Sequence, residues 1–218
     1  MPEPLTEIEA RIVGALVEKQ LTTPEYYPLT MNALVNACNQ KNNREPVMSL
    51  DEPTVARAIQ NLRDRNLVYV FHGSTGRVPK YKHMLPSYYE LDEGGTAIMT
   101  VMMLRGPQTV GELRERTGRM YEFADLGEVH TALEGLINRD EPLVVKLDHL
   151  PGRKEPRYAH LLSGELDVEE IQAIAAATPA SVSLAGDRIS KLEGEITALR
   201  DELTALKEEF AEFRKQFD

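Results

Sequence analysis

One pattern of residues occurs twice in this chain of 218 residues, and that internal repeat limits the folds the chain can adopt. The pattern Val-x-x-Ala-(Ile/Leu)-x-x-Leu at 55–62 returns at 129–136. In both places it is followed by Arg-Asp-x-x-Leu-Val and then by Pro-(Lys/Arg)-Tyr-x-His-x-Leu. Because three matches occur in the same order at nearly constant spacing, we predict two copies of one domain, at residues 1–85 and 86–162.

Each copy is expected to contain three helices followed by a β-hairpin, which is the element order of a winged helix. In the first copy, Thr6 begins a capping box that predicts a helix start, and Thr30 can cap a second helix. A third helix is predicted over 53–66, where apolar residues recur every three or four positions. Residues 67–71 and 77–83 are predicted strands on either side of a glycine-containing turn.

The second copy predicts the same elements in the same order. Helices are expected over 96–104 and from the caps Thr109 and Asp125, followed by strands at 143–147 and 157–161. The predicted fold class is therefore mainly α, of the α+β type, with two tandem winged-helix domains and a long C-terminal coiled-coil helix.

The coiled-coil prediction concerns residues 182–218, which follow a linker at 163–181. Apolar residues recur there at alternating spacings of three and four over about five heptads. Ile at position a with Leu at position d favours a parallel dimer, and the flanking charges are complementary in that register. The alternatives are that this helix packs against the chain's own domains or that it is a single solvated helix. The candidate dimerisation residues are Ile189, Leu192, Ile196, Leu199, Leu203, Leu206, Phe210 and Phe213.

The third helix of the first copy is the candidate DNA reader. In a helix-turn-helix this helix enters the major groove, and Arg, Asn and Gln are the side chains that bond guanine and adenine edges. At the equivalent positions the second copy carries Thr131, Glu134 and Gly135, so we expect that copy to be a scaffold or partner surface. The candidate DNA-binding residues are Arg57, Gln60, Asn61, Arg65, Arg77, Lys80, Lys82, Lys41 and Arg44.

Residues 36–46 form a polar segment just before this helix, rich in Asn and containing two of the basic candidates. One interpretation is a loop whose side-chain amides satisfy backbone groups. The other is a contact with phosphate or with a partner, because loops often carry function. Both interpretations stay open at the level of the sequence.

Two segments carry a family resemblance. They are Leu-Thr-Met-Asn-Ala-Leu-Val-Asn-Ala-Cys-Asn-Gln-Lys-Asn-Asn-Arg-Glu-Pro-Val at 29–47 and Arg-Lys-Glu-Pro-Arg-Tyr-Ala-His-Leu-Leu at 153–162. With them the chain resembles the YceH-like family of uncharacterised bacterial proteins over residues 5–162. The resemblance implies tandem winged helices and a bacterial cytoplasmic setting, and it carries no catalytic residue.

No motif of the sequence points to an enzyme. The chain has no Gly-rich phosphate loop and no CxxC pair, and its five histidines lack metal-ligand spacing. His83 and His160 stand at equivalent positions of the repeat, so we expect them to be structural. The single cysteine, Cys38, lies on an apolar helix face and is expected in the core. We therefore expect no catalytic residue, no metal and no cofactor.

The net charge of −10 opposes binding of nucleic acid through the overall field of the protein, but it leaves room for a local basic face. No signal peptide and no apolar run of membrane length are evident, so we expect a cytoplasmic protein with no membrane partner. The first hypothesis is a dimeric DNA-binding protein, a transcriptional regulator. The alternative is an adaptor that binds an unidentified protein partner and makes no direct contact with DNA.

Overall fold

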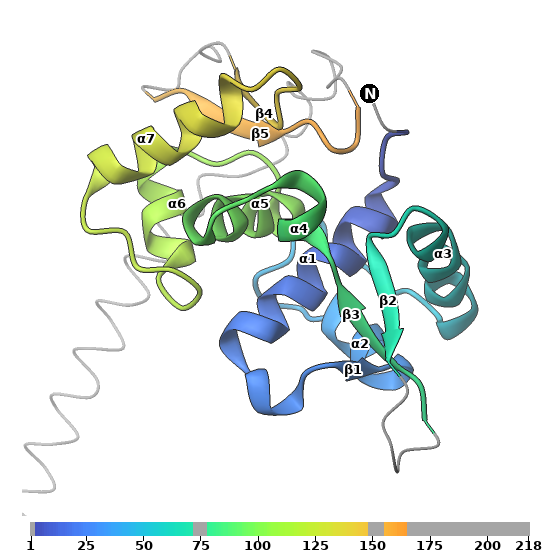
Figure 1. Ribbon diagram of the computed structural model, residues 1–218. Coiled ribbons are helices and arrows are strands. Elements are labelled where there is room, and N and C mark those ends of the chain that lie inside the picture. The colour runs from blue at the N-terminus through green and yellow to red at the C-terminus, as the bar shows by residue number, and fades with distance from the viewer. Residues whose placement is uncertain (1–2, 72–77, 148–154, 165–218) are drawn as a thin grey trace, which may run out of the picture. The chain divides into compact units, whose positions relative to one another are not determined.

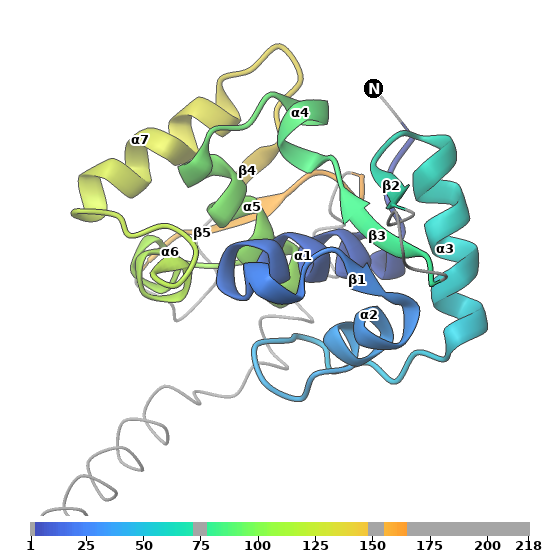
Figure 2. The same cartoon turned by 60° about the horizontal axis from the view of Figure 1, so that its bottom comes forward.

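Residues 3–71, 78–147 and 155–164 are described by the computed structural model, which Figures 1 and 2 show in two views. They form a mixed α/β structure in which helices predominate and are accompanied by small antiparallel sheets. Apart from residues 163 and 164, the predicted linker and the coiled-coil helix lie outside the described residues. The eight candidate dimerisation residues and Arg77 therefore lie outside them too.

The first copy of the repeat folds into helices with a two-residue strand between them, followed by two longer strands. Its sheet is antiparallel in the order β1-β3-β2, with β3 in the centre. Strand β1 pairs Leu29 with Tyr81, and with two residues it is too short to show an alternating pattern in the sequence. The elements are α1 (Glu7–Thr22), the 3₁₀ helix η1 (Pro24–Tyr26), β1 (Leu29–Thr30), α2 (Met31–Cys38), α3 (Glu52–Asp64), β2 (Val68–Phe71) and β3 (Lys80–His83).

The second copy has the same general order, preceded by a short helix that the sequence did not predict. Its elements are α4 (Leu85–Tyr89), α5 (Glu93–Arg105), α6 (Val110–Thr117), α7 (Leu126–Ile137), β4 (Val144–Leu147) and β5 (Arg157–His160). Strands β4 and β5 form an antiparallel pair. Helix α5 begins before the predicted residue 96, because the Asp92 carboxylate accepts the Gly95 backbone N–H at 2.7 Å and caps the helix there.

The helix starts follow from local capping chemistry. The Thr6 backbone N–H donates to the Glu9 carboxylate at 2.8 Å, and the Glu9 N–H donates back to the Thr6 hydroxyl at 3.2 Å. Helix α3 is shorter than the predicted 53–66, and Asn66 just beyond it adopts a φ of 58° in the left-handed region. Four predicted N-caps are confirmed: Thr6, Thr30, Thr109 and Asp125.

Helices α1 and α5 lie side by side in the middle of the described region and join the two copies (Figures 1 and 2). Ile12 and Leu16 of α1 and Ile98 and Met102 of α5 are fully buried. At Gly14 the helices approach so closely that a Cβ atom would lie 3.0 Å from the Leu104 side chain. Since the buried residues of both copies form one continuous cluster, the two copies share a core.

Backbone hydrogen bonds also connect the copies at two places outside this helix pair. The Glu45 N–H, in the loop after α2, donates to the Leu104 carbonyl at 2.8 Å. The Leu5 N–H, just before α1, donates to the Leu162 carbonyl at 2.7 Å, just after β5. The second bond brings the beginning and the end of the described region together.

Arg44 is buried among partners in the first copy, with its side chain 0% exposed. Its guanidinium makes a two-pronged ion pair with Glu18, at 2.6 and 3.0 Å. It also donates to the Ala37 and Asn43 carbonyls and to the Gln40 amide oxygen. The sequence predicted a DNA contact at Arg44, and this prediction is corrected: all of its donors are used inside the protein, where they hold the loop after α2 against α1.

We expect Arg44→Met to lower the free energy of unfolding by about 3–5 kcal/mol, because it leaves the Glu18 carboxylate without its buried partner. Urea unfolding of the full chain measures this loss. Lys19→Met is the matched control: Lys19 lies 3.7 Å from the same carboxylate at a more exposed position, and its loss should cost about 1 kcal/mol or less. Equal losses in the two variants would contradict the assignment.

His83 is buried at the end of β3, in keeping with the expected structural role. Its Nδ1 accepts the Leu85 backbone N–H at 3.3 Å, and its ring lies 5.9 Å from that of Tyr27. Burial, with a smaller contribution from the nearby charge of Lys82, lowers the pKa of His83 to about 4. The histidine is therefore neutral in the folded protein at pH values where it is protonated in the unfolded chain.

Between pH 6.5 and pH 4 the unfolded chain binds a proton at His83 that the folded protein does not, so stability falls as the pH is lowered through this window. We expect His83→Asn to reduce that fall, because the Asn carbonyl can accept the Leu85 N–H and does not titrate. The measurement is the free energy of unfolding of both proteins at several pH values. Parallel pH profiles would argue against a buried neutral His83.

Candidate nucleic-acid interface

The outer face of α3 presents the three polar residues that the sequence singled out. Val55, Ala58, Ile59 and Leu62 point into the core, and the opposite side of the helix is left to solvent. The side chains on that side are exposed as predicted: Arg57, Gln60 and Asn61. Such residues can bond base edges, because their donors and acceptors match those of guanine and adenine.

The bonds on this face are local and weakly held. The Gln60 amide donates to the Asp64 carboxylate at 2.9 Å and accepts from Arg63 at 3.0 Å, all at exposed positions. Arg57 has one long contact, 3.5 Å, to the Thr54 hydroxyl. Exposed bonds of this kind exchange readily with water, so these side chains are available to a ligand.

Arg65, the fourth candidate on α3, is engaged elsewhere. Its guanidinium donates to the backbone carbonyls of Glu3 and Pro4 and lies 3.9 Å from the Glu9 carboxylate. It holds the segment before α1 against the end of α3. We therefore leave Arg65, like Arg44, out of the candidate interface.

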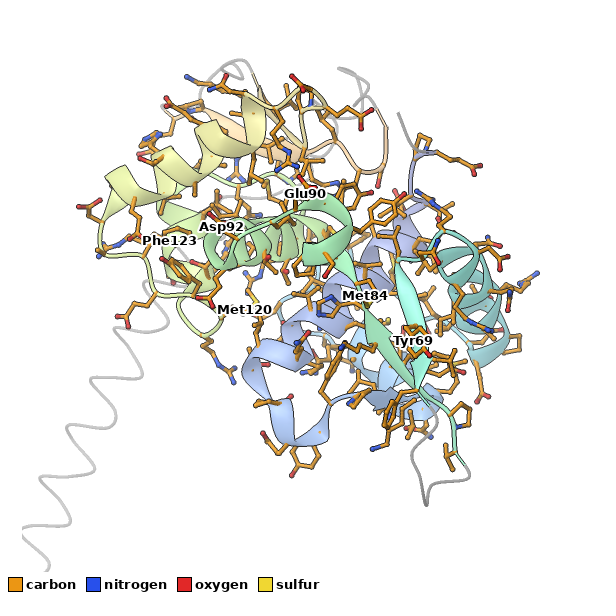
Figure 3. All side chains as sticks on the ribbon, in the orientation of Figure 1. Tyr69, Met84, Glu90, Asp92, Met120 and Phe123 are labelled. Atoms are coloured by element: carbon orange, nitrogen blue, oxygen red, sulfur yellow. The ribbon has the colours of Figure 1, made fainter. Side chains whose placement is uncertain are left out.

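The outer face of the sheet next to α3 combines lysines with aromatic rings. Strand β2 lies beside α3 in both views (Figures 1 and 2), and it pairs Tyr69 with Lys82 and Phe71 with Lys80. Tyr69 is 62% exposed and Phe71 45% exposed, and Tyr69 is labelled on β2 in Figure 3. Because lysines attract phosphates and aromatic rings can stack on bases, this face suits nucleic acid.

Tyr69 and Phe71 were not among the predicted site residues, because aromatic residues are also common in ordinary strands. Their signal was the alternation along β2, where Val68 is buried and its neighbour Tyr69 is exposed. Large aromatic residues at both outward positions of a short strand are unusual for a solvated surface. Lys41 is exposed but lies apart from this face, in a groove formed with the second copy.

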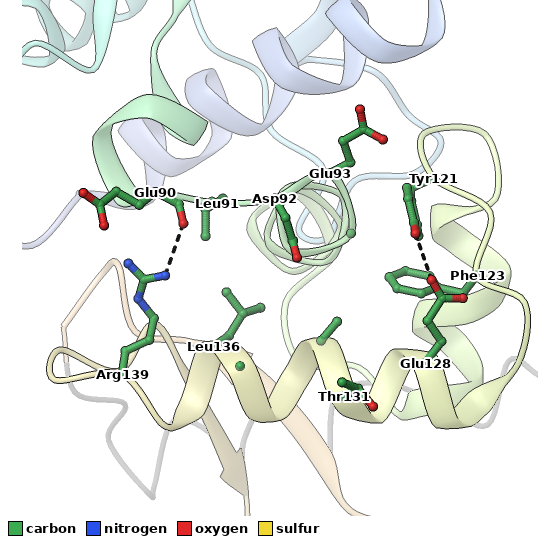
Figure 4. Close-up of a pocket in the computed structure, with 13 residues that line it drawn as sticks. Glu90, Leu91, Asp92, Glu93, Tyr121, Phe123, Glu128, Thr131, Leu136 and Arg139 are labelled. Atoms are coloured by element: carbon green, nitrogen blue, oxygen red, sulfur yellow. Dashed lines mark hydrogen bonds between the residues drawn. The ribbon is translucent and has the colours of Figure 1, made fainter.

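The corresponding surface of the second copy is acidic. A groove of about 520 Å³ lies between α7 and the segment that leads into α5 (Figure 4). Its carboxylates include Glu90, Glu93 and Glu128, against one guanidinium from Arg139. Glu128 is held by the Tyr121 hydroxyl at 2.8 Å. A phosphate backbone would be repelled here.

Within the described residues, no group of three or more His, Cys, Asp and Glu side chains could hold a metal ion. Cys38 is buried in the core, and burial raises the pKa of its thiol to about 12 against the opposing charges of Arg11 and Arg44. A thiol that stays protonated is a poor nucleophile. None of the described helices combines the length and the apolar character needed to cross a membrane.

Comparison with known proteins gives a family match and full-length relatives. The family described as "Protein of unknown function, DUF480" matches residues 5–153. A UPF0502 protein of Citrifermentans bemidjiense is 55% identical over 218 residues, which cover 100% of both chains. UPF0502 proteins of Pelobacter propionicus and Opitutus terrae are similar as well. The first is 47% identical over 98% of both chains; the second is 49% identical over 88% of this chain and 81% of its own.

Proposed function

This chain belongs to the bacterial family described as protein of unknown function DUF480, in line with the resemblance seen in its sequence, and we propose that it is a DNA-binding protein. In this proposal the two copies of the repeat are tandem winged-helix domains and the protein is a transcriptional regulator. The observation that carries the proposal is the outer face of α3, with Arg57, Gln60 and Asn61 exposed beside a sheet that presents lysines and aromatic rings.

Helix α3 would lie in the major groove of DNA and recognise the base sequence there. The Arg57 guanidinium can donate two bonds to the O6 and N7 atoms of guanine, and the amides of Gln60 and Asn61 can pair with the N6 and N7 atoms of adenine. Lys80 and Lys82 on β3 would contact phosphates and set the orientation of the helix. The exposed Gln60–Asp64 bond would be exchanged for a bond to a base.

A dimer would double the contact between α3 and DNA. The coiled coil predicted at 182–218 would hold two chains and present two α3 helices to a site with two-fold symmetry. The acidic second copy would then face away from the phosphates and serve as a scaffold.

The second candidate function is a protein-interaction adaptor. The carboxylate-lined groove beside α7 favours it, because that groove suits a partner segment that carries basic residues. Leu126, 48% exposed at the start of α7, offers an apolar contact nearby. In this case the full chain would bind a protein through the second copy and show no affinity for DNA.

The phosphate contacts can be tested by replacing Lys80 and Lys82 together with alanine. We expect weaker binding to sheared genomic DNA and a slope of log affinity against log salt that is smaller by about 2, since two phosphate contacts are lost. Fluorescence anisotropy of the full chain at several salt concentrations gives both quantities. Lys146→Ala, an exposed strand lysine of the second copy, is the control and should change neither. Absence of binding at low salt by the unaltered chain would favour the adaptor.

The base contacts can be tested separately with Arg57→Ala. Loss of a bidentate contact to guanine should cost about 1–3 kcal/mol at the preferred site and leave binding to unrelated DNA nearly unchanged. Selection from a pool of random duplexes, followed by anisotropy on the selected sequence, measures this difference. If Arg57→Ala weakens binding to all duplexes equally, Arg57 contacts phosphate and α3 does not read bases through it.

A further inference from the structure

A second groove, which we call the basic groove, lies where the two copies of the repeat meet. The C-terminal ends of α1, α5 and α6 and the loop at 40–43 form its walls, and Met120, labelled in Figure 3, lies at its edge. Its volume is about 320 Å³. A single carboxylate, Glu18, faces five cations in its lining: Lys19, Lys41, Arg105, Arg116 and Arg119.

This concentration of positive charge runs against the character of the chain, whose net charge is −10. Helix C-termini account for part of it, because each carries roughly half a negative charge and attracts cations in its last turn. Lys19, Arg105 and Arg116 occupy such positions. Glu18 is already paired with the buried Arg44, and Glu112 lies 3.4 Å from Arg116. With all of these included, an excess of roughly two to three positive charges is left without compensation.

Some of these cations form hydrogen bonds within the described part of the protein, and others do not form ion pairs there. Arg105 donates to the Asn43 side chain, and Arg116 donates to Gln108. Burial lowers the pKa of Arg105, and the like charges of Arg116 and Arg44 lower it further, so these guanidinium groups repel one another. Lys41 and Arg119 are exposed, and neither makes an ion pair within the described residues. The groove therefore has fixed donors in its wall and free cations at its rim.

The wall that carries Lys41 is held in place by the rest of the fold. The loop is anchored to α1 through Arg44 and to α5 through the bond from the Glu45 N–H to the Leu104 carbonyl. The amides of Gln40, Asn42 and Asn43 line the groove beside the cations. A site that combines preorganised amides with several cations suits an anion with several oxygens, and a phosphate group is such an anion.

We propose that the basic groove binds a small phosphorylated molecule of the nucleotide or polyphosphate class, held between the two copies of the repeat. Its volume fits a small ligand and is too small for duplex DNA, which a protein reads with convex elements such as helices. The ligand would contact residues of both copies, so its binding would stabilise their contact. This site is separate from the outer face of α3, and the inference does not depend on DNA binding.

The test uses the full chain with two probes, inorganic pyrophosphate and ATP, in buffers of equal ionic strength. We expect both probes to raise the midpoint of thermal unfolding by several degrees and to bind with a measurable heat in calorimetric titration. The double variant Lys41→Gln with Arg119→Gln should bind either probe about tenfold or more weakly, because each removed cation takes away a charge-assisted contact.

The matched control is Arg63→Gln with Lys146→Gln, which removes two exposed cations outside the groove lining and should leave the affinity for both probes unchanged. Circular dichroism confirms that each variant is folded. Two results would overturn the proposal: no binding of either probe by the unaltered chain, or equal weakening in the control. If neither probe binds and the groove variant loses affinity for DNA, the groove is a contact for nucleic acid.

Discussion

The buried guanidinium groups of Arg11 and Arg44 determine where the loop after α2 can lie. Arg11 donates to the carbonyls of Cys38 and Pro46, and Arg44 donates to those of Ala37 and Asn43. A buried cation is costly unless its donors are satisfied, so the loop is held in the conformation that supplies these acceptors. From there the loop reaches α5 and forms one wall of the basic groove. The junction between the copies therefore rests on polar groups as well as on the apolar core.

The repeat produces similar elements with different surroundings. Helices α1 and α5 come first or nearly first in their copies, and they pack on each other, so α5 is buried along almost its whole length. Helices α3 and α7, which occupy equivalent places in the two copies, both keep an exposed face. The face of α3 carries Arg57 and Gln60, whereas that of α7 carries Thr131 and Glu134. The exposed positions of the two outer helices can differ because the core is formed by their buried faces.

The sequence was informative where structure depends on neighbouring residues. Capping by Thr6 and the inward face of α3 depend on residues three or four positions apart, and both are as predicted. The candidate site was predicted less well. The ion pair of Arg44 joins residues 26 positions apart, and Arg65 bonds to Glu3 and Pro4 across more than half of the first copy. Such contacts depend on packing, and an arginine that is buried looks the same in a sequence as one that is exposed.

The bond from the Leu5 N–H to the Leu162 carbonyl places the two ends of the described region next to each other. Pro4 also lies within 4 Å of the position that a Cβ atom would take at Gly164. Whatever precedes residue 3 and whatever follows residue 164 thus leave the folded region at the same place. A short linker could join these two ends and the chain could be reopened at a surface loop, because circular permutation requires adjacent ends.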